Sequence, residues 1–534
     1  MTTYLYPQHR PATLARRGIV AAPHYLASEA GLDLLKAGGN AIDAAIAASA
    51  MLQVVYPFLC GLGGDVFMLI YDAKSGQLYG LNGSGRSAQT ATLERYAELG
   101  YTTMPTYGIH AVTVPGCASG WEAAAQRFGR LGLAASLAPA ISYAEEGFPV
   151  GPGLHSALTV GSTRAEYHRS WHTHFLPDGT VPPAGAMIRF PTLARTFQAI
   201  AQQGSEVFYR GEVAEQIAAF FEREGGLITR NDLAAHQSDW VMPLSVSFAG
   251  LTVYELPPNT QGVAALQMLG ILDSLPLGDE PLAPETVHLA VEAKKLAFAD
   301  RAAYLTDPAF MRVDPAALID PNYLAQRRAL LNPKQAQPSF APGSFTGDTI
   351  YLCTADGEGN VVSLIQSNYM GFGSGVVVDD TGIVLQNRGA YFSLNPNAAN
   401  VLAPSKRTLH TLIPSMALHD GRPVMVFGAM GGDGQAQTHL QVYTAVARFG
   451  LNMQQALEMP RWVHGGTPQG ETLLVESRFP SETLDALHRM GHSIQETVPW
   501  SSAMGHANGI LFDPSTGVMQ GGSDPRAEGI AAGW

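Results

Sequence analysis

The chain has 534 residues, 46% of them hydrophobic and 14% charged, so it can bury a large core and is too apolar to be disordered. Its 57 glycines and 35 prolines are spread without a Gly-X-Y period, which excludes collagen and a long coiled coil. The formal net charge is −13 and no run of Lys and Arg occurs, so we expect a small-molecule partner and no nucleic acid.

The cysteine content and the hydropathy of the chain bear on its compartment. No CxxC spacing occurs, so we expect neither a disulfide framework nor a zinc site from the three cysteines, Cys60, Cys117 and Cys353. The most apolar stretch, Ala41 to Leu62, is interrupted by polar residues and a proline, and the N-terminus lacks the apolar core of a secretory signal. We therefore expect a cytoplasmic protein without a membrane partner.

The N-terminal part is predicted to place two helices before a β-hairpin. Ala27 to Lys36 has leucine and alanine at helical spacing and precedes a glycine pair that can end a helix. Asn40 can cap a second helix, the alanine-rich segment Ala41 to Val55. A strand from Val66 to Tyr71, a turn with glycine and a returning strand then predict the hairpin.

From Leu93 to about Asp300 the pattern is mainly helical. Amphipathic helices are predicted at Ala118 to Phe128, Phe190 to Gln203, Val213 to Glu224 and Thr286 to Tyr304. One strand pair interrupts them, Leu244 to Phe248 and Leu251 to Leu256. Residues 306–347 are rich in Pro, Ala, Gln and Ser, and this composition predicts a linker.

Strands dominate the rest of the chain. Ile350 to Ala355 and Val361 to Gln366 are β-branched and apolar, and a short polar loop joins them. Further elements are predicted as strands at Val376 to Val378, Ile383 to Gln386 and Val424 to Phe427 and as a helix at Gln437 to Phe449. This order of α-rich and β-rich pieces predicts an α+β fold in which helices cover sheets.

The common hydrolase and nucleotide-binding motifs are absent from the sequence, which has no HExxH, no Walker P-loop and no GxSxG elbow. His288 and Glu292 lie four residues apart on a predicted helix. With no second histidine nearby in the sequence, a solvated or salt-bridged helix face is expected there rather than a metal site. We expect no metal and no cofactor.

Thr349 stands where the predicted linker meets the first strand of the C-terminal part. An amide hydrolase can use the first residue of a strand as nucleophile if the chain is cut before it, because the new α-amine then serves as base. The Thr349 hydroxyl could make this cut by attacking the Asp348 carbonyl. A threonine that opens a strand is also simply a good β-former, so position alone leaves both interpretations open.

A glycine-rich segment follows the predicted strand Val424 to Phe427 and contains Gly428, Gly431, Gly432 and Gly434. Free N–H groups of such a segment, at the start of a helix, can bind a phosphate or the oxyanion of a tetrahedral intermediate. A tight turn from strand to helix would explain the same glycines.

Five segments together resemble a known family. In chain order they are GIVAAPHYLASEAGLDLLKAGGNAIDAA, VEAKKLAFADRAAYLTDP, GDTIYLCTADGEGNVVSLIQS, GFGSG and GAMGGDGQ. Taken together they are similar to the γ-glutamyltransferases, a family of N-terminal-nucleophile hydrolases, from about Gly18 to His464. The resemblance implies a four-layer αββα sandwich.

The resemblance also implies a precursor that cleaves itself between Asp348 and Thr349. The products would be a large, α-rich subunit, residues 1–348, and a small, β-rich subunit, residues 349–534, which stay associated. Further oligomerisation is compatible with the sequence.

The same resemblance assigns the reacting groups. Thr349 would be the nucleophile and its freed amine the base. Ser367 would supply the second hydroxyl beside them, and the N–H groups of Gly431 and Gly432 would form the oxyanion hole.

The substrate-binding positions depart from the family pattern, in which an Arg and a Ser-Ser pair hold the γ-glutamyl α-carboxylate and an Asn and a Q-x-D-D stretch hold the α-amine. Ser84 stands where that Arg belongs, with Arg86 two residues further on. The other replacements are Tyr369 for the Asn, Arg388 to Tyr391 for the Q-x-D-D stretch, and His410 with Thr411 for the serine pair. The candidate substrate-binding set is Arg86, Tyr369, Arg388, Tyr391, His410 and Thr411.

These departures favour an acyl group that ends in a carboxylate and lacks the α-amine. Loss of the acid removes the partner of an ammonium, whereas Arg388 adds a cation suited to a carboxylate. We therefore hypothesise an amidase or acylase for a glutaryl-type group. One alternative is an ordinary glutathione hydrolase in which Arg86 or Arg388 holds the carboxylate. Another is an unprocessed, non-catalytic protein that binds a small anion at Gly431 and Gly432.

Overall fold

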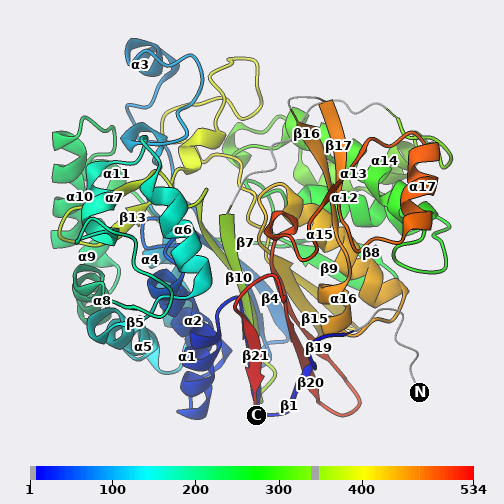
Figure 1. The fold of residues 1–534 in the computed structure, drawn as a ribbon, viewed down its shortest axis with the longest axis horizontal. Helices are drawn as coiled ribbons and strands as arrows, with labels where there is room; N and C mark the ends of the chain where they lie inside the picture. The colour runs from blue at the N-terminus through cyan, green and yellow to red at the C-terminus, as the bar shows by residue number, and fades with distance from the viewer. Residues whose placement is uncertain (1–7, 338–347, 468–469) are drawn as a thin grey trace.

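A computed structural model describes residues 8–337, 348–467 and 470–534. Within these ranges two seven-stranded antiparallel sheets lie face to face, and helices cover the outer side of each sheet (Figure 1). The predicted αββα sandwich is confirmed.

The first sheet contains the strand with Thr349 near its centre. Its strands, in spatial order, are β21 (Ile530–Gly533), β2 (Gly18–Ala22), β10 (Asp348–Asp356), β11 (Val361–Tyr369), β3 (Asp65–Asp72), β4 (Gln77–Gly83) and β7 (Asp239–Val241). The hairpin β10–β11 thus lies between strands from the N-terminal part of the chain.

The second sheet carries the glycine-rich segment at the end of one of its central strands. Its strands, in spatial order, are β1 (Thr13–Ala15), β20 (Met519–Ser523), β19 (Ala507–Phe512), β15 (Arg422–Ala429), β14 (Ser415–His419), β9 (Leu251–Glu255) and β8 (Leu244–Phe248). The glycine-rich segment follows β15.

Helices form the two outer layers, which stand left and right of the sheets in Figure 1. Those packed on the first sheet are α1 (Tyr25–Lys36), α2 (Ala41–Val55) and α4 (Cys117–Phe128), with α5 (Gly132–Glu146) and α8 (Pro191–Gln203) outside them. Those packed on the second sheet are α12 (Gly262–Leu272), α15 (Gly434–Tyr443) and α16 (Met453–Glu458), with α13 (Pro284–Tyr304) outside α12.

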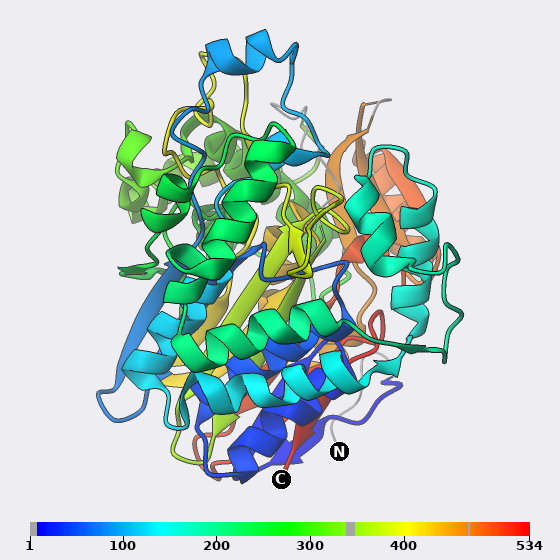
Figure 2. The same cartoon turned by 90° about the vertical axis from the view of Figure 1, so that its left-hand side faces the viewer.

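Smaller elements surround this sandwich, and α3 projects from the body of the molecule (Figure 2). The remaining helices are α3 (Leu93–Glu98), α6 (Pro152–Ser162), α7 (Arg169–Phe175), α9 (Glu206–Tyr209), α10 (Glu212–Arg223), α11 (Arg230–Ala234), α14 (Pro321–Arg328) and α17 (Ser481–Arg489). Short strands pair as β5 (Phe148–Pro149) with β6 (Met187–Ile188), β12 (Val376–Val378) with β13 (Ile383–Leu385), and β17 (Gly470–Glu476) with β16 (Trp462–Thr467) and β18 (Ile494–Thr497). Short helical turns are η1 (Ile109–Ala111), η2 (Pro308–Phe310), η3 (Pro315–Ile319), η4 (Arg388–Tyr391), η5 (Thr444–Arg448) and η6 (Ser502–Met504).

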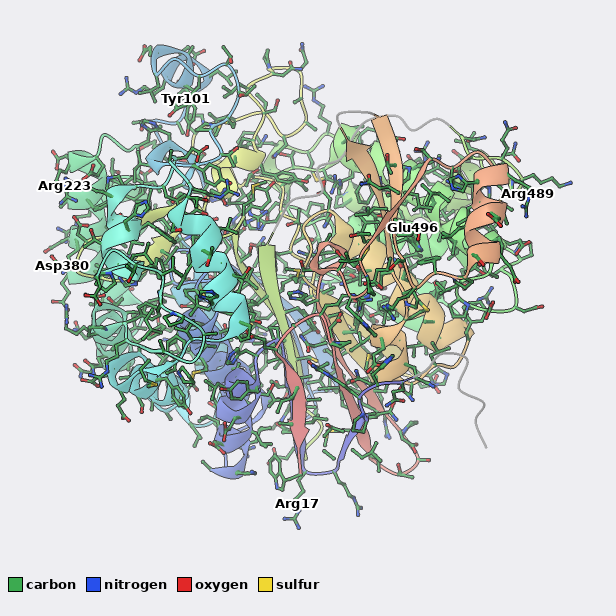
Figure 3. The ribbon with its side chains drawn as sticks, in the orientation of Figure 1. Arg17, Tyr101, Arg223, Asp380, Arg489 and Glu496 are labelled. Atoms are coloured by element: carbon green, nitrogen blue, oxygen red, sulfur yellow. The ribbon has the colours of Figure 1, made fainter. Side chains whose placement is uncertain are left out.

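Strand periodicity divides the first sheet between two cores. Phe67 and Ile365 belong to the core between the sheets, whereas Met68 and Leu364 belong to the core beneath the helices. Since side chains alternate along a strand, Asp65 and Ser367 also face the space between the sheets. Charged side chains such as Arg17, Arg223 and Arg489 project from the periphery (Figure 3).

The strongly periodic elements are confirmed. Helices 27–36 and 41–55 occur as α1 and α2, Asn40 caps α2, and the predicted hairpins occur as β3–β4, β8–β9 and β10–β11. The last predicted helix is split, because α15 ends at Tyr443 and continues as a π-helical turn, Thr444–Arg448.

The predicted linker 306–347 is wrong for its described part, residues 306–337. Three Asp-Pro pairs there begin η2, η3 and α14, and each aspartate accepts a hydrogen bond from an N–H two residues on. Asp at the N-cap and Pro at the first helical position are helix-start signals that composition alone concealed. Residues 338–347 lie outside the described residues. Over the part of the chain that is described, no helix has both the length and the apolarity to cross a bilayer.

Asp43, in the first turn of α2, joins that helix to the start of α5. Its Oδ1 accepts hydrogen bonds from the N–H groups of Arg130 (3.2 Å), Leu131 (3.0 Å) and Gly132 (3.3 Å), and its Oδ2 from Asn40 (2.9 Å). We expect Asp43→Ala to lower the free energy of unfolding by at least about 2 kcal/mol, because these donors lose a charged acceptor.

Urea unfolding followed by tryptophan fluorescence measures this loss in a Thr349→Ala background, in which the expected cut before Thr349 is prevented and the protein unfolds as one chain. Asp43→Asn keeps one carbonyl oxygen and should lose less stability than Asp43→Ala. Equal stability of the alanine variant and the wild type would contradict the assigned role.

Candidate active site

The candidate residues meet where β10 begins, beside the end of β11 and the start of β3. Figure 1 shows β10 between the two helical layers. Ser367 on β11 is paired in register with Asp65 on β3, and both are buried. Thr349 lies at an irregularity in the β10–β11 pairing, between Asp348 and Ile350.

The Thr349 hydroxyl is held by two polar side chains. It donates a hydrogen bond to Ser367 Oγ (3.1 Å) and accepts one from Gln435 Nε2 (3.4 Å). Ser367 Oγ also accepts a hydrogen bond from the Tyr369 N–H (2.7 Å). Thr349 and Ser367 are each only 1% exposed, so the hydroxyl pair is enclosed by protein.

The glycine-rich segment between β15 and α15 lies against this hydroxyl pair through Gln435, in the first turn of α15. Gly431 and Gly432 have φ of 132° and 55°, a backbone that favours glycine at both positions. Within the described ranges neither N–H donates a hydrogen bond, whereas both carbonyls accept N–H groups from the start of α15. Unpaired backbone N–H donors of this kind are what an oxyanion hole requires.

Arg388, on η4, is a fully buried cation whose hydrogen-bonding capacity is largely unused. Its Nη1 donates to Thr411 Oγ1 (3.3 Å), and its guanidinium lies 4.2 Å from the centre of the Tyr369 ring. Its Nε and Nη2 have no hydrogen-bond partner among the described residues. Burial lowers the pKa of Arg388 from its usual value. These two nitrogens form one edge of the guanidinium fork, the geometry that holds a carboxylate.

Tyr369 and Tyr391 connect Arg388 to the glycine-rich segment. The two rings meet edge to face, with 5.5 Å between their centres, and the Tyr391 hydroxyl donates to Asp433 Oδ1 (2.7 Å). Tyr369 has φ of 81°, a strained backbone for a residue with a side chain, which is typical of functional sites. Arg301 forms an ion pair with the same Asp433 oxygen (2.7 Å).

Asp433, directly after the glycine pair, is therefore a buried carboxylate whose charge is balanced by Arg301. Burial alone would raise its pKa, but the charge and hydrogen bond of Arg301 turn the net shift downward. Gln261 connects the glycine-rich segment to Thr411, because its Nε2 donates to the carbonyls of Thr411 (2.9 Å) and Gly432 (3.1 Å).

His410 and Thr411 belong to the segment that leads into β14, and Thr411 contacts Arg388. His410 Nε2 is 2.9 Å from Asp65 Oδ2, and both side chains are buried. Burial, then the nearby Arg388 and Arg407, hold the pKa of His410 well below its usual range, so the imidazole is neutral.

Arg86 is not brought into this cluster. Its guanidinium pairs with Asp307 (3.0 Å) and with the Ser405 carbonyl (3.2 Å), and its side chain is 41% exposed. Ser84, at the position of the family arginine, is buried and donates to Asn82 Oδ1 (2.6 Å). The structure thus places every predicted site residue except Arg86 in one connected group, with the side chain of Asp348 outside the described residues.

Five members of the group were not predicted from the sequence: Asp65, Gln261, Arg301, Asp433 and Gln435. Asp433 and Gln435 had a signal, since both directly follow the glycine pair. Gln261 caps α12 and Arg301 lies on α13, and they reach the site only through the packing of α12 on the second sheet and of α13 on α12.

The His288 and Glu292 pair is salt-bridged as predicted, but it is buried rather than solvated. Glu292 Oε1 contacts Lys295 Nζ (2.7 Å), and His288 Nδ1 lies 2.8 Å from Nε2 of His492, a histidine distant in sequence. These donors could hold a metal ion by type and distance. The Lys295 ammonium, however, already neutralises the carboxylate.

Comparisons with known proteins show which family the sequence is similar to. The sequence model of the Gamma-glutamyltranspeptidase family matches residues 27–534. The chain is 40% identical to the glutathione hydrolase-like YwrD proenzyme of Bacillus subtilis over 98% of this chain and 99% of the relative. It is 41% identical to the oxamate amidohydrolase proenzyme of Klebsiella pneumoniae, again over 98% of this chain and 99% of the relative.

A solved structure shows the same fold. The crystal structure of cephalosporin acylase from Bacillus halodurans is 45% identical and superposes with a TM-score of 0.92 over 100% of this chain and 99% of that chain. These relatives are named as hydrolases or acylases, and two of them as proenzymes. The chain therefore belongs to the γ-glutamyltranspeptidase family, as its motifs indicated, and is an enzyme.

Proposed function

We propose that the protein is an autoprocessing amide hydrolase whose acyl donors end in a carboxylate and lack an α-amine. The Thr349 hydroxyl attacks the Asp348 carbonyl, the peptide nitrogen leaves as the Thr349 α-amine, and water hydrolyses the resulting ester. The mature chain then begins at Thr349, with a base beside its own nucleophile. The proenzyme relatives support this maturation.

In the mature enzyme the α-amine accepts the Thr349 hydroxyl proton as the oxygen attacks the substrate amide. The N–H groups of Gly431 and Gly432 stabilise the oxyanion, and Ser367 keeps the nucleophile in place through its 3.1 Å contact. The amine of the substrate leaves as its C–N bond breaks and takes the proton held by the Thr349 α-amine. Water then hydrolyses the ester, which releases the acyl group as an acid and restores the Thr349 hydroxyl.

The observation that carries the substrate class is the unpaired edge of Arg388. A buried guanidinium with Nε and Nη2 unpartnered among the described residues offers two parallel donors for one carboxylate. Among the described residues of this group, Asp433 is already paired with Arg301 and Asp65 is in contact with His410, so neither carboxylate is free to bind an ammonium. The site therefore favours a dicarboxylic monoamide over a γ-glutamyl amide.

A γ-glutamyl donor is the second candidate, supported by the relative named as glutathione hydrolase-like. Arg388 would then hold the α-carboxylate, and the ammonium would have to compete with Arg301 for Asp433. Oxamate, the substrate in the name of the 41% identical relative, represents the shortest carboxylate-bearing amide.

The test compares kcat/KM for glutaryl p-nitroanilide and γ-glutamyl p-nitroanilide, with ammonia release from oxamate as a third assay. We expect a preference of about 100-fold or more for the glutaryl compound over the γ-glutamyl one, because a buried ammonium would lack a partner. A preference for the γ-glutamyl compound would overturn the proposed class.

Two arginine variants locate the carboxylate contact. Arg388→Lys keeps the charge but loses the fork, so we expect kcat/KM for the glutaryl compound to fall by about 10- to 100-fold. Arg86→Gln is the matched control, because Arg86 is half-exposed and paired with Asp307. A loss confined to Arg86→Gln would assign the carboxylate to Arg86 instead.

A further inference from the structure

Asp65 is a carboxylate that the proposed reaction does not use, although it lies beside the acyl-binding group. It begins β3 opposite Ser367 and is completely buried. Its Oδ1 accepts the Gly85 N–H (3.1 Å), and its Oδ2 contacts His410 Nε2 (2.9 Å). His410 is followed directly by Thr411, the residue that holds Arg388.

Asp65 interacts with Arg388 through its charge, and no hydrogen bond joins the two side chains among the described residues. The titratable and charged groups that face it are His410, Arg388, Arg407, Cys117 and Tyr209. Burial raises the pKa of Cys117 and of Tyr209, and it lowers that of His410, so all three are neutral. Arg407 is already paired with Asp239.

A substrate carboxylate at the unpaired edge of Arg388 would therefore place two anions around one buried guanidinium. Taking up a proton removes one of these charges without moving a residue. The His410 contact is suited to the protonated form, because a carboxylic acid at Oδ2 can donate to Nε2 of a neutral imidazole.

We propose that Asp65 is the proton-linked positioning residue of the acyl-carboxylate site: it accepts one proton from solvent, shared with His410, when a carboxylate binds to Arg388. The inference rests on the proposed function, because it assumes that Arg388 holds the acyl carboxylate. Bound carboxylate and protonated Asp65 then leave Arg388 with one counter-ion.

The pKa of Asp65 places this exchange in the neutral range. Burial raises it to about 7, although Arg388, the Gly85 N–H and Arg407 each act to lower it. Below pH 7 Asp65 is protonated before the ligand arrives, and above pH 7 the ligand must bring a proton with it. The dissociation constant of a carboxylate ligand should therefore rise with pH, approaching a 100-fold increase between pH 6 and pH 9.

Calorimetric titration with glutarate tests the inference without catalysis. At pH 8, in buffers of different ionisation enthalpy, the wild type should take up close to one proton per glutarate bound. Asp65→Asn keeps the shape and a donor for His410 but cannot ionise, so it should bind glutarate without proton uptake and with a pH-independent dissociation constant.

The chain offers a matched control in a second buried pair, Glu255 with His439 (2.7 Å), in the core of the second sheet. Glu255→Gln removes a buried carboxylate of the same kind and should leave proton uptake at the wild-type value. Kinetics should distinguish the same two variants. Asp65→Asn should change the pH profile of KM for glutaryl p-nitroanilide more than it changes kcat, whereas Glu255→Gln should keep the wild-type profile.

The two proposals fail in different ways. Glutarate binding without proton uptake, or uptake that persists in Asp65→Asn, would overturn the role of Asp65 and leave the proposed function intact. Absence of glutarate binding to the wild type at pH 6, or binding unaffected by Arg388→Lys, would overturn the substrate class itself.

Discussion

Replacing Thr349 with alanine should leave the protein as one polypeptide of 534 residues, whereas the wild type should separate under denaturing conditions into residues 1–348 and 349–534. The reason is that alanine lacks the hydroxyl that attacks the Asp348 carbonyl. Amide hydrolysis should be lost as well, because both the nucleophile and the freed amine are missing. Intact mass measurement of both proteins gives the answer directly.

Two variants separate the hydroxyl from its surroundings. Thr349→Ser keeps the nucleophile and should still be cleaved. Ser367→Ala removes the hydroxyl that accepts the Thr349 hydrogen bond (3.1 Å), so we expect slower cleavage at an unchanged position. A wild type that remains one chain after prolonged incubation, or a Thr349→Ala chain that is still cut, would overturn the assignment.

Asp524→Ala should cost more stability than any substitution at the surface. Asp524 is completely buried between Arg461 (2.6 Å) and Arg526 (3.0 Å), and Arg526 also pairs with the buried Glu476 (2.7 Å). Removing the aspartate leaves guanidinium charges in the interior with one carboxylate to share. We expect the free energy of unfolding to fall by about 3–5 kcal/mol, the range for breaking a buried ion pair.

The pH dependence of this effect has a defined sign. Burial alone would raise the pKa of Asp524, but Arg461 and Arg526 hold it down at about 2, below the value of about 4 in an unfolded chain. The stabilisation is therefore complete above pH 4 and is lost as the pH falls through about 2. The stability difference between wild type and Asp524→Ala should shrink over that window.

Urea unfolding in the uncleaved Thr349→Ala background measures these differences on a single chain. Glu98→Ala is the control, because the Glu98 ion pair with Arg95 (3.1 Å) is exposed, and we expect no measurable change. An Asp524→Ala protein as stable as the control would contradict the predicted role of the buried network.

The sequence was most informative where a local rule acts. Helix α2 could be predicted because Asn40 caps an alanine-rich segment, and the Asn40 amide does accept N–H groups of Ile42 and Asp43. Thr349 and the glycine pair were singled out through short motifs. Their approach through Gln435 was not predictable, since it depends on how α15 packs on the second sheet.

Substrate residues were harder to place, because their roles depend on partners from distant segments. The sequence favoured Arg388 as the cation for a glutaryl-type group and left Arg86 or Arg388 open for a γ-glutamyl group. Only the fold shows that Asp307 pairs with Arg86, whereas an edge of Arg388 has no partner among the described residues. Asp65 carried a signal of its own, an acid directly before the apolar run Val66 to Tyr71.

Each sheet contains strands from both sides of Thr349. In the first sheet β10 lies between β2 and β11, and in the second sheet β9 from the earlier part pairs with β14 from the later part. Once the chain is cut, these strands no longer share a covalent chain, and refolding would require two polypeptides to find each other at a rate set by their concentration. The mature protein would then owe its persistence to slow unfolding, having reached its structure while still a single chain.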